Sequence, residues 1–340
     1  MHNSFNLQEI VADIDIIFNT ELNDISQKLG IKQFTTPQRN KGPTFFNIHY
    51  YYPLVFYDDF KEVDIELHRL LSIYGRLYLI HILQTDRILD DRSEVQPVDL
   101  FKSFLLYEKA TEYVRKVFLP DSKFLEYYEK YHMEYINAIL LEKTVHYDKI
   151  MSYPLSDYEA ISKGKSAMAK TITTGLAILN GSPELIPYID NSQDNFYIGY
   201  QFYDDLRDWK EDLKNRQFSL LLTRVLKGLG YVGKSDRENI PDLEEIGRYM
   251  YYSGLAEWAL KEAEHYYNKS LSVLQDLSFL TWRKIILDYR KKCIDLKRDL
   301  ALIKNRILKG KTYGSKENLL PPPKKIKLRS GDNNVLLSAI

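Results

Sequence analysis

The chain has 340 residues, and its 47 lysines and arginines balance 47 aspartates and glutamates, so the formal net charge is zero. A neutral chain is a poor general nucleic-acid binder, and we expect no nucleic-acid partner. The single cysteine excludes a disulfide within the chain and a cysteine-based metal site. No secretory signal opens the sequence, and no run of about 18 apolar residues predicts a membrane span. We therefore expect a cytoplasmic protein.

Apolar residues recur at helical spacing almost throughout, and no stretch alternates convincingly as a strand would, which predicts an all-α fold. The first helix is expected over 5–29 and is followed by a loop over 30–43. A long helix is expected over 59–91, and its middle is apolar nearly all round, which predicts burial on several sides. Six more helices are expected, over 99–118, 122–150, 156–180, 190–227, 242–274 and 278–309.

The end of the chain differs from the rest in composition. Basic residues dominate from Lys304 to Arg329 against one acid, Glu317, and three consecutive prolines interrupt any helix. This composition predicts a solvated, disordered tail over 311–340, beyond one helical domain over 1–310. Contact of the tail with an anionic membrane or with a partner is the alternative.

Two clusters of aspartates stand on helices that are predicted to be buried. In the first, Asp86 and Asp90 are four residues apart and share one helix face, and Asp91 follows directly. Like charges at this spacing destabilise a helix by a few tenths of a kcal/mol. A bound cation would remove the conflict.

The second cluster follows the strongly aromatic stretch 195–203. Asp204, Asp208 and Asp212 are spaced four residues apart, and Asp205 lies beside the first of them. Carboxylates on a buried helix are costly unless they are paired or bound to a metal. Hard oxygen ligands on two facing helices suit Mg²⁺, which takes one or two carboxylates together with substrate phosphates and water.

The alternative for both clusters is a solvated helix face with internal ion pairs. Arg87 would then pair with Asp91, and Arg207 with Glu211. The segment Gly164-Lys165-Ser166 looks like the end of a phosphate-binding loop. It does not indicate one, because both the preceding strand and the first glycine of such a loop are missing.

Three segments resemble a known family. Gln201-Phe-Tyr-Asp204-Asp205-Leu-Arg-Asp208 resembles the second motif of polyprenyl synthases, Q-x-x-D-D-x-x-D. Asp86-Arg-Ile-Leu-Asp90-Asp91 resembles the D-x-x-x-D-D motif of squalene and phytoene synthases, and Lys165-Ser-Ala is similar to the Lys-Thr helix of polyprenyl synthases. Over about 65–225 the chain thus resembles the class I isoprenoid synthase superfamily, which also includes terpene cyclases.

This resemblance implies a single-domain helical bundle with a central cavity, two or three Mg²⁺ ions, a prenyl diphosphate substrate and, as in many relatives, a homodimer. By resemblance the metal ligands are the carboxylates of both motifs: Asp86, Asp90, Asp91, Asp204, Asp205, Asp208 and Asp212. The catalytic members are Asp86, Asp90, Asp204 and Asp208. Contacts to the diphosphate would come from Lys165, Arg216 and Gln201.

Ionisation of an allylic diphosphate leaves a cation, which aromatic ring faces stabilise. Candidates for such a wall are Tyr74, Tyr78, Tyr200 and Tyr203, with core packing as the alternative role for each. The basic elements that serve a second diphosphate in elongating enzymes are missing, since Asp91 is followed by Arg92-Ser-Glu. This departure favours a terpene synthase that uses one diphosphate. The alternatives are a chain-elongating or head-to-head trans-prenyltransferase, or a non-catalytic subunit, which Arg87 within the first motif would support.

Overall fold

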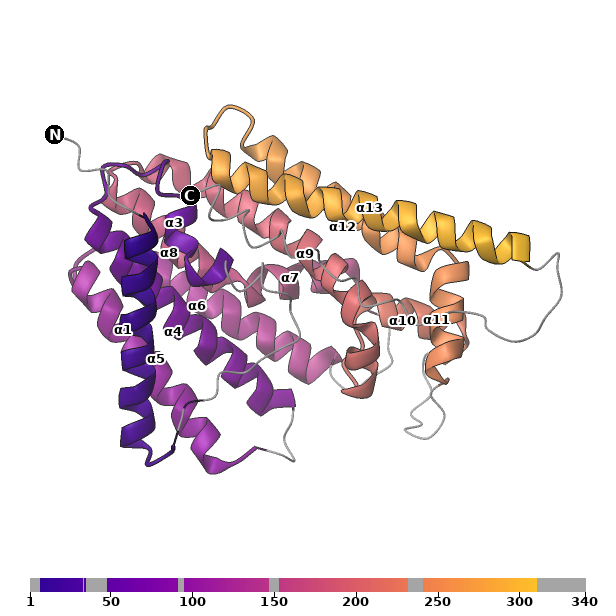
Figure 1. Cartoon of the computed structure of the whole chain (residues 1–340), viewed down its shortest axis with the longest axis horizontal. Helices are drawn as coiled ribbons and strands as arrows, with labels where there is room; N and C mark the ends of the chain where they lie inside the picture. Colours follow the sequence, from indigo (N-terminus) through magenta and orange to yellow (C-terminus); the bar gives the residue numbers. More distant parts are fainter. Residues whose placement is uncertain are drawn as a thin grey trace. The chain divides into compact units, whose positions relative to one another are not determined.

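The computed structural model describes residues 7–32, 34, 48–90, 95–146, 153–231 and 241–310, without the side chains of 7, 303 and 305–310. Within these ranges every regular element is helical and no strand occurs, which confirms the all-α prediction (Figure 1). None of the described helices is both long enough and apolar enough to cross a membrane. The chain divides into two compact units, and each is described by itself.

Unit 1 contains the chain up to Lys130 together with Ala169–Ile186. Its central helix is α4 (Ile65–Asp90), and α5 (Pro97–Val117) packs along much of its length. The unit also contains α1 (Leu7–Lys28), the short α3 (Tyr52–Val55), most of α8 (Ala167–Leu179) and the turn η2 (Pro183–Leu185). The middle of α4 is buried on several sides, as the sequence predicts: the fully buried apolar side chains are those of Leu71, Ile73, Leu77 and Ile80.

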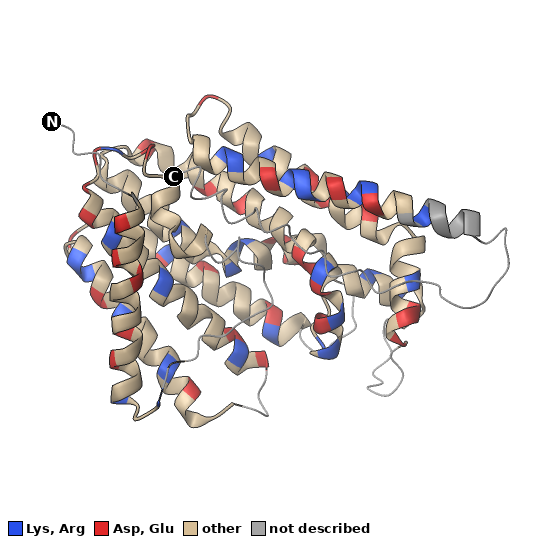
Figure 2. Cartoon of the chain, in the orientation of Figure 1, with Lys and Arg blue, Asp and Glu red and all other residues tan. Residues whose placement is uncertain are grey.

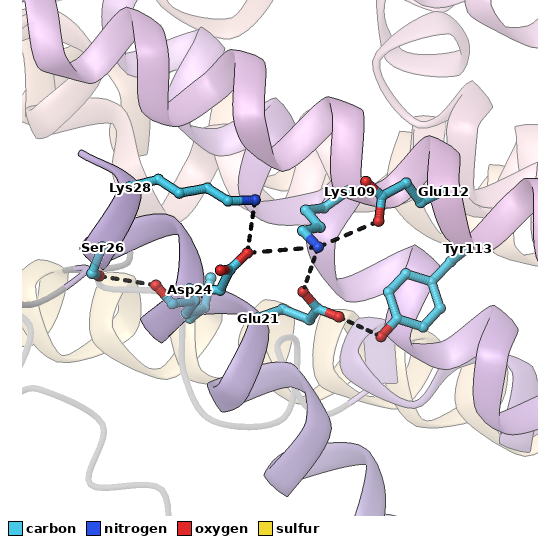
Figure 3. Close-up of polar contacts among 8 residues, drawn as sticks. Glu21, Asp24, Ser26, Lys28, Lys109, Glu112 and Tyr113 are labelled. Atoms are coloured by element: carbon cyan, nitrogen blue, oxygen red, sulfur yellow. Dashed lines mark hydrogen bonds and ion pairs between the residues drawn. The ribbon is translucent and has the colours of Figure 1, made fainter.

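Polar contacts attach α1 to α5 in unit 1 (Figure 3). The ammonium of Lys109 lies 3.1 Å from Glu21 and 3.6 Å from Asp24 on α1, and 3.3 Å from Glu112 on its own helix. Tyr113 donates a hydrogen bond of 2.7 Å to the other oxygen of Glu21. Because one ammonium serves three carboxylates, the charges hold α1 in register on α5.

Unit 2 contains Tyr131–Met168 and the described part of the chain from Pro187 to Gly310. It begins within α6 (Phe124–Leu140) and continues through the π-helical turn η1 (Leu141–His146) and α7 (Leu155–Lys165). After α9 (Ile186–Lys214) come α10 (Leu220–Gly228), α11 (Leu243–Tyr252), α12 (Leu255–Val273) and α13 (Leu280–Gly310).

The core of unit 2 is rich in aromatic side chains. Phe196 on α9 contacts Tyr267 of α12 and Trp282 and Tyr289 of α13, with ring centroids 4.7–5.6 Å apart. Ion pairs Lys297–Glu264 and Lys304–Glu257 also join α13 to α12. Acidic and basic residues follow one another along α13 (Figure 2).

Three of the helices predicted from periodicity are each two helices, at 156–180, 190–227 and 242–274. The first is interrupted at Ser166, whose hydroxyl donates to the carbonyls of Ser162 and Lys163 and competes with the backbone. The other two breaks contain Arg216 and Gly254, which adopt left-handed φ angles of 56° and 86°. Such a residue ends a helix whatever the apolar spacing around it.

Two sequence-based expectations concern the organisation of the whole chain. The tail over 311–340 lies outside the described residues, so its disorder stays a prediction. The single domain over 1–310 and its central cavity also stay predictions.

Candidate active site

Asp205 of the second aspartate motif is held by side chains from two helices of unit 2. The Gln201 amide, one turn earlier on α9, donates a hydrogen bond of 2.5 Å to Oδ1 of Asp205. Tyr158 on α7 donates one of 3.0 Å to Oδ2. The residue is only 2% exposed, and each of its carboxylate oxygens accepts a hydrogen bond from a side chain.

Burial raises the pKa of Asp205 to about 7. The hydrogen bonds from Gln201 and Tyr158 and the positive charge of Lys165 act in the opposite direction, while the charge of Asp204 raises the pKa further. Desolvation therefore outweighs the donors around this carboxylate. A nearby cation would restore the ionised form at neutral pH.

Asp204 has a different set of neighbours. Tyr200, one turn earlier, donates a hydrogen bond of 3.2 Å to Oδ1 of Asp204. The rings of Tyr200 and Tyr203 both lie against that of Tyr289 on α13, with centroids 5.6 Å and 6.3 Å away. Burial, followed by the charge of Asp204, raises the pKa of Tyr200 far above its usual value, so the phenol keeps its proton and stays a donor.

The remaining members of the motif lie near the C-terminal end of α9. Asp208 and Asp212 are half-buried. Arg216 follows in the left-handed conformation, and its N–H donates to the carbonyl of Leu213, while that of Gln217 donates to Asp212. These bonds form a Schellman ending in which glycine is the usual residue. An arginine in this conformation costs about 1 kcal/mol relative to glycine.

Lys165 is the last residue of α7 and faces the same side of that helix as Tyr158, seven residues earlier. Its charge acts on Asp205, and its ammonium pairs with Glu142 of η1 at 2.9 Å. The preceding Gly164 lets α7 approach α6 closely, because a Cβ there would lie 2.3 Å from Cβ of Ala138. The glycine that resembles part of a phosphate-binding loop therefore has a packing role.

The first aspartate motif lies at the end of α4 in unit 1. Asp86 is buried, and Asp90 is the last residue of the helix. Asp91 lies outside the described residues, so its predicted role and its pairing with Arg87 stay predictions. The C-terminal end of a helix carries partial negative charge, so carboxylates there are unfavourable unless a cation is near.

The structure thus allows a test of whether these residues fit Mg²⁺. Among the described residues, no group of three or more histidine, cysteine, aspartate or glutamate side chains is placed to hold a metal ion by itself. The predicted donor set fits the ion in its chemistry, because every predicted ligand is a carboxylate oxygen. Desolvation around Asp205 also favours a cation.

The tyrosines predicted to line a cavity have packing roles in the structure. In unit 1 the hydroxyl of Tyr74 lies 2.9 Å from that of Thr171 on α8, and the Tyr78 ring packs edge-on against Tyr107. Tyr200 and Tyr203 pack in the core of unit 2, as described above. Stabilisation of a carbocation by any of them stays a prediction.

Sequence reasoning missed three residues of this site. Tyr158 could have been found from its spacing of seven residues before Lys165, which places both on one helix face. Glu142 and Lys143 lie in a π-helical turn whose position has no periodic signal, so only the folded chain reveals them. Of the predicted residues, Gln201, Asp205 and Lys165 come together in one cluster.

No family model and no curated protein matches the chain. Solved structures do match: octaprenyl pyrophosphate synthase from Helicobacter pylori has a TM-score of 0.67 at 15% identity, covering 83% of this chain and 99% of that one. Geranylgeranyl pyrophosphate synthase from Corynebacterium glutamicum has a TM-score of 0.65 at 16% identity, covering 85% and 92%. A decaprenyl diphosphate synthase from Rhodobacter capsulatus has 0.64 at 14%, covering 85% and 96%.

These likenesses define the class of fold. The chain has the all-helical fold of the prenyl diphosphate synthases, which confirms the class I isoprenoid synthase fold predicted from its motifs.

Proposed function

We propose that the chain is a Mg²⁺-dependent enzyme that ionises an allylic prenyl diphosphate, and that it works as a trans-prenyltransferase. The observation that carries the proposal is the cluster around Asp205, in which Gln201, Tyr158 and Lys165 surround a buried carboxylate of the second motif. The likeness to prenyl diphosphate synthases supports the transferase over the terpene synthase that the sequence favours.

In this proposal the metal ligands are the carboxylates of both motifs: Asp86, Asp90, Asp91, Asp204, Asp205, Asp208 and Asp212. The chemistry that Mg²⁺ supplies when bound is neutralisation of the charge that develops on the leaving diphosphate. Gln201 and Tyr158 hold the Asp205 carboxylate in one orientation. Lys165 and Arg216 supply positive charge to the diphosphate oxygens.

A terpene synthase remains the second candidate because of one observation in the sequence. The segment after Asp91, Arg92-Ser-Glu, lacks the basic residues that would serve a second diphosphate. The homodimer and the cytoplasmic location expected from the sequence are part of the same proposal for either enzyme.

The deciding experiment measures pyrophosphate release by the full chain with Mg²⁺ and C10, C15 or C20 allylic diphosphates, each with and without isopentenyl diphosphate. Turnover that requires isopentenyl diphosphate supports the transferase, and release from one allylic substrate alone supports the terpene synthase. Asp208→Ala should abolish either activity. If no substrate reacts, the chain is a non-catalytic member of this fold.

A further inference from the structure

Lys165, a predicted diphosphate contact, is already paired with a carboxylate of its own chain. Its Nζ lies 2.9 Å from Oε1 and 3.2 Å from Oε2 of Glu142. The ammonium of Lys143 lies 3.2 Å from the same Oε2. One carboxylate therefore bridges two ammonium groups, one at the end of α7 and one in η1.

The bridge is shielded from water at Lys143 and partly exposed at Glu142 and Lys165. The side chain of Lys143 is 6% exposed, and those of Glu142 and Lys165 are 24% and 26% exposed. An ammonium is costly to bury without a counter-ion. Without the carboxylate, two like charges would face each other in a partly desolvated place, and an anion would relieve their repulsion.

The backbone holds this arrangement in place. The π-helical turn places Glu142 and Lys143 directly after α6, and such turns occur frequently at functional sites. The close approach of α7 at Gly164, where a Cβ would lie 2.6 Å from the carbonyl oxygen of Glu134, brings Lys165 to the same turn. The pairing is therefore set by packed helices rather than by two mobile surface side chains.

We propose that Glu142 is an internal counter-ion that occupies the anion site of Lys143 and Lys165 in the ligand-free protein, and that phosphate oxygens of the ligand displace it. The inference rests on the proposed function for the identity of the anion, a diphosphate. Glu142 then weakens diphosphate binding and speeds release of the diphosphate, because the carboxylate competes with the anion for the two ammonium groups. Lys143 becomes a diphosphate contact beside Lys165.

The test is the affinity of the full chain for inorganic pyrophosphate, measured by calorimetry with and without Mg²⁺. Partly exposed ion pairs contribute about 1 kcal/mol, so Glu142→Gln should tighten pyrophosphate binding by about three- to tenfold. The gain should shrink in high salt, which screens charge. It should also shrink when Lys165→Met is added, because only the Lys143–Glu142 pair then remains. Lys143→Met alone should weaken binding.

The matched control is Glu264→Gln, which breaks the Lys297–Glu264 pair elsewhere in unit 2, where the side chains are 25% and 26% exposed. It should leave pyrophosphate affinity unchanged. Equal or weaker binding by Glu142→Gln overturns the inference, as does an equal gain in the control. If Glu142→Gln fails to fold, unchanged affinity in Lys143→Met overturns it instead.

The same measurements separate this inference from the proposed function. If Glu142→Gln binds pyrophosphate more tightly while the wild-type chain turns over no prenyl diphosphate, the counter-ion stands and the proposed enzyme fails. If the wild-type chain is active but Glu142→Gln brings no gain, the enzyme stands and the counter-ion fails.

Discussion

Asp205 is a buried carboxylate, and burial of its charge opposes folding. Its carboxyl is 2% exposed, and desolvation raises its pKa to about 7 despite two hydrogen-bond donors. The folded state therefore holds the proton more tightly than the unfolded state does. The stability contributed by this proton is present at low pH and is lost as the pH rises through about 7.

Asp205→Asn should therefore stabilise the metal-free protein at pH 8, by about 1–3 kcal/mol, since one pKa unit corresponds to about 1.4 kcal/mol. The gain should be smaller at pH 5, where the wild-type carboxyl is protonated in the folded state. Urea unfolding at both pH values measures it. Asp276→Asn, at an exposed carboxylate of the same unit, should show no such pH dependence. A gain that is equal at both pH values would contradict the raised pKa.

At Arg216, one substitution should change the free energy of unfolding and the affinity for pyrophosphate in opposite directions. Its φ of 56° suits glycine, so Arg216→Gly should raise the free energy of unfolding by up to about 1 kcal/mol. Pyrophosphate affinity should fall, because the proposed contact is lost. Lys214→Gly is the control: within the last turn of α9 it should cost about 1 kcal/mol and leave affinity unchanged. Unchanged pyrophosphate binding in Arg216→Gly would remove Arg216 from the site.

At the scale of elements, the site depends on how closely α7 packs on α6. Gly164 is the point of contact, where an added Cβ would meet both Ala138 and the carbonyl oxygen of Glu134. Gly199 has the same role between α9 and α12, with the carbonyl oxygen of Ala263 2.9 Å from its Cβ position. Both helices of the Asp205 cluster are thus held by glycine contacts.

Gly164→Ala should destabilise the protein by about 1–3 kcal/mol, because backbone of α6 cannot move aside as a side chain would. It should also weaken pyrophosphate binding by moving Lys165. Thermal unfolding and calorimetry provide the two readouts. Ser156→Ala, at an exposed position of the same helix, should stay within about 0.5 kcal/mol of wild type. A stabilised Gly164→Ala variant would mean that helix propensity outweighs the clash.

At the scale of the whole molecule, the predicted homodimer needs a surface that can pair with itself, and we propose an exposed apolar face of α5 for it. Leu100, Phe101 and Phe104 are 56–59% exposed and lie on one face of this helix. A twofold dimer requires only one such self-complementary patch. Large exposed apolar side chains grouped in this way mark contact surfaces.

The double variant Phe101→Glu, Phe104→Glu should convert a dimer to a monomer, because four carboxylates would then meet in the interface. Light scattering after size exclusion measures the mass, and circular dichroism verifies the helices. Ile16→Glu, at an isolated exposed position on α1, should leave the mass unchanged. A wild-type chain that is monomeric at tens of micromolar would contradict the prediction.

From the sequence alone we could predict the all-α class, the burial of the middle of α4 and the helix that carries the second aspartate motif. Each of these depends on local spacing, since a helix places residues three and four apart on one face. Periodicity could not find the breaks at Ser166, Arg216 and Gly254. These depend on single φ angles and side-chain caps, which leave the apolar spacing on either side intact.

Only the tertiary structure decided which charges meet. Glu142 and Lys165 are 23 residues apart in sequence, and Tyr158 and Asp205 are 47 apart. Contacts of this kind follow from the packing of α6, α7 and α9, which is set by glycines and by a π-helical turn. Electrostatic energies also depend on burial, so the raised pKa of Asp205 exists only once the helices enclose it.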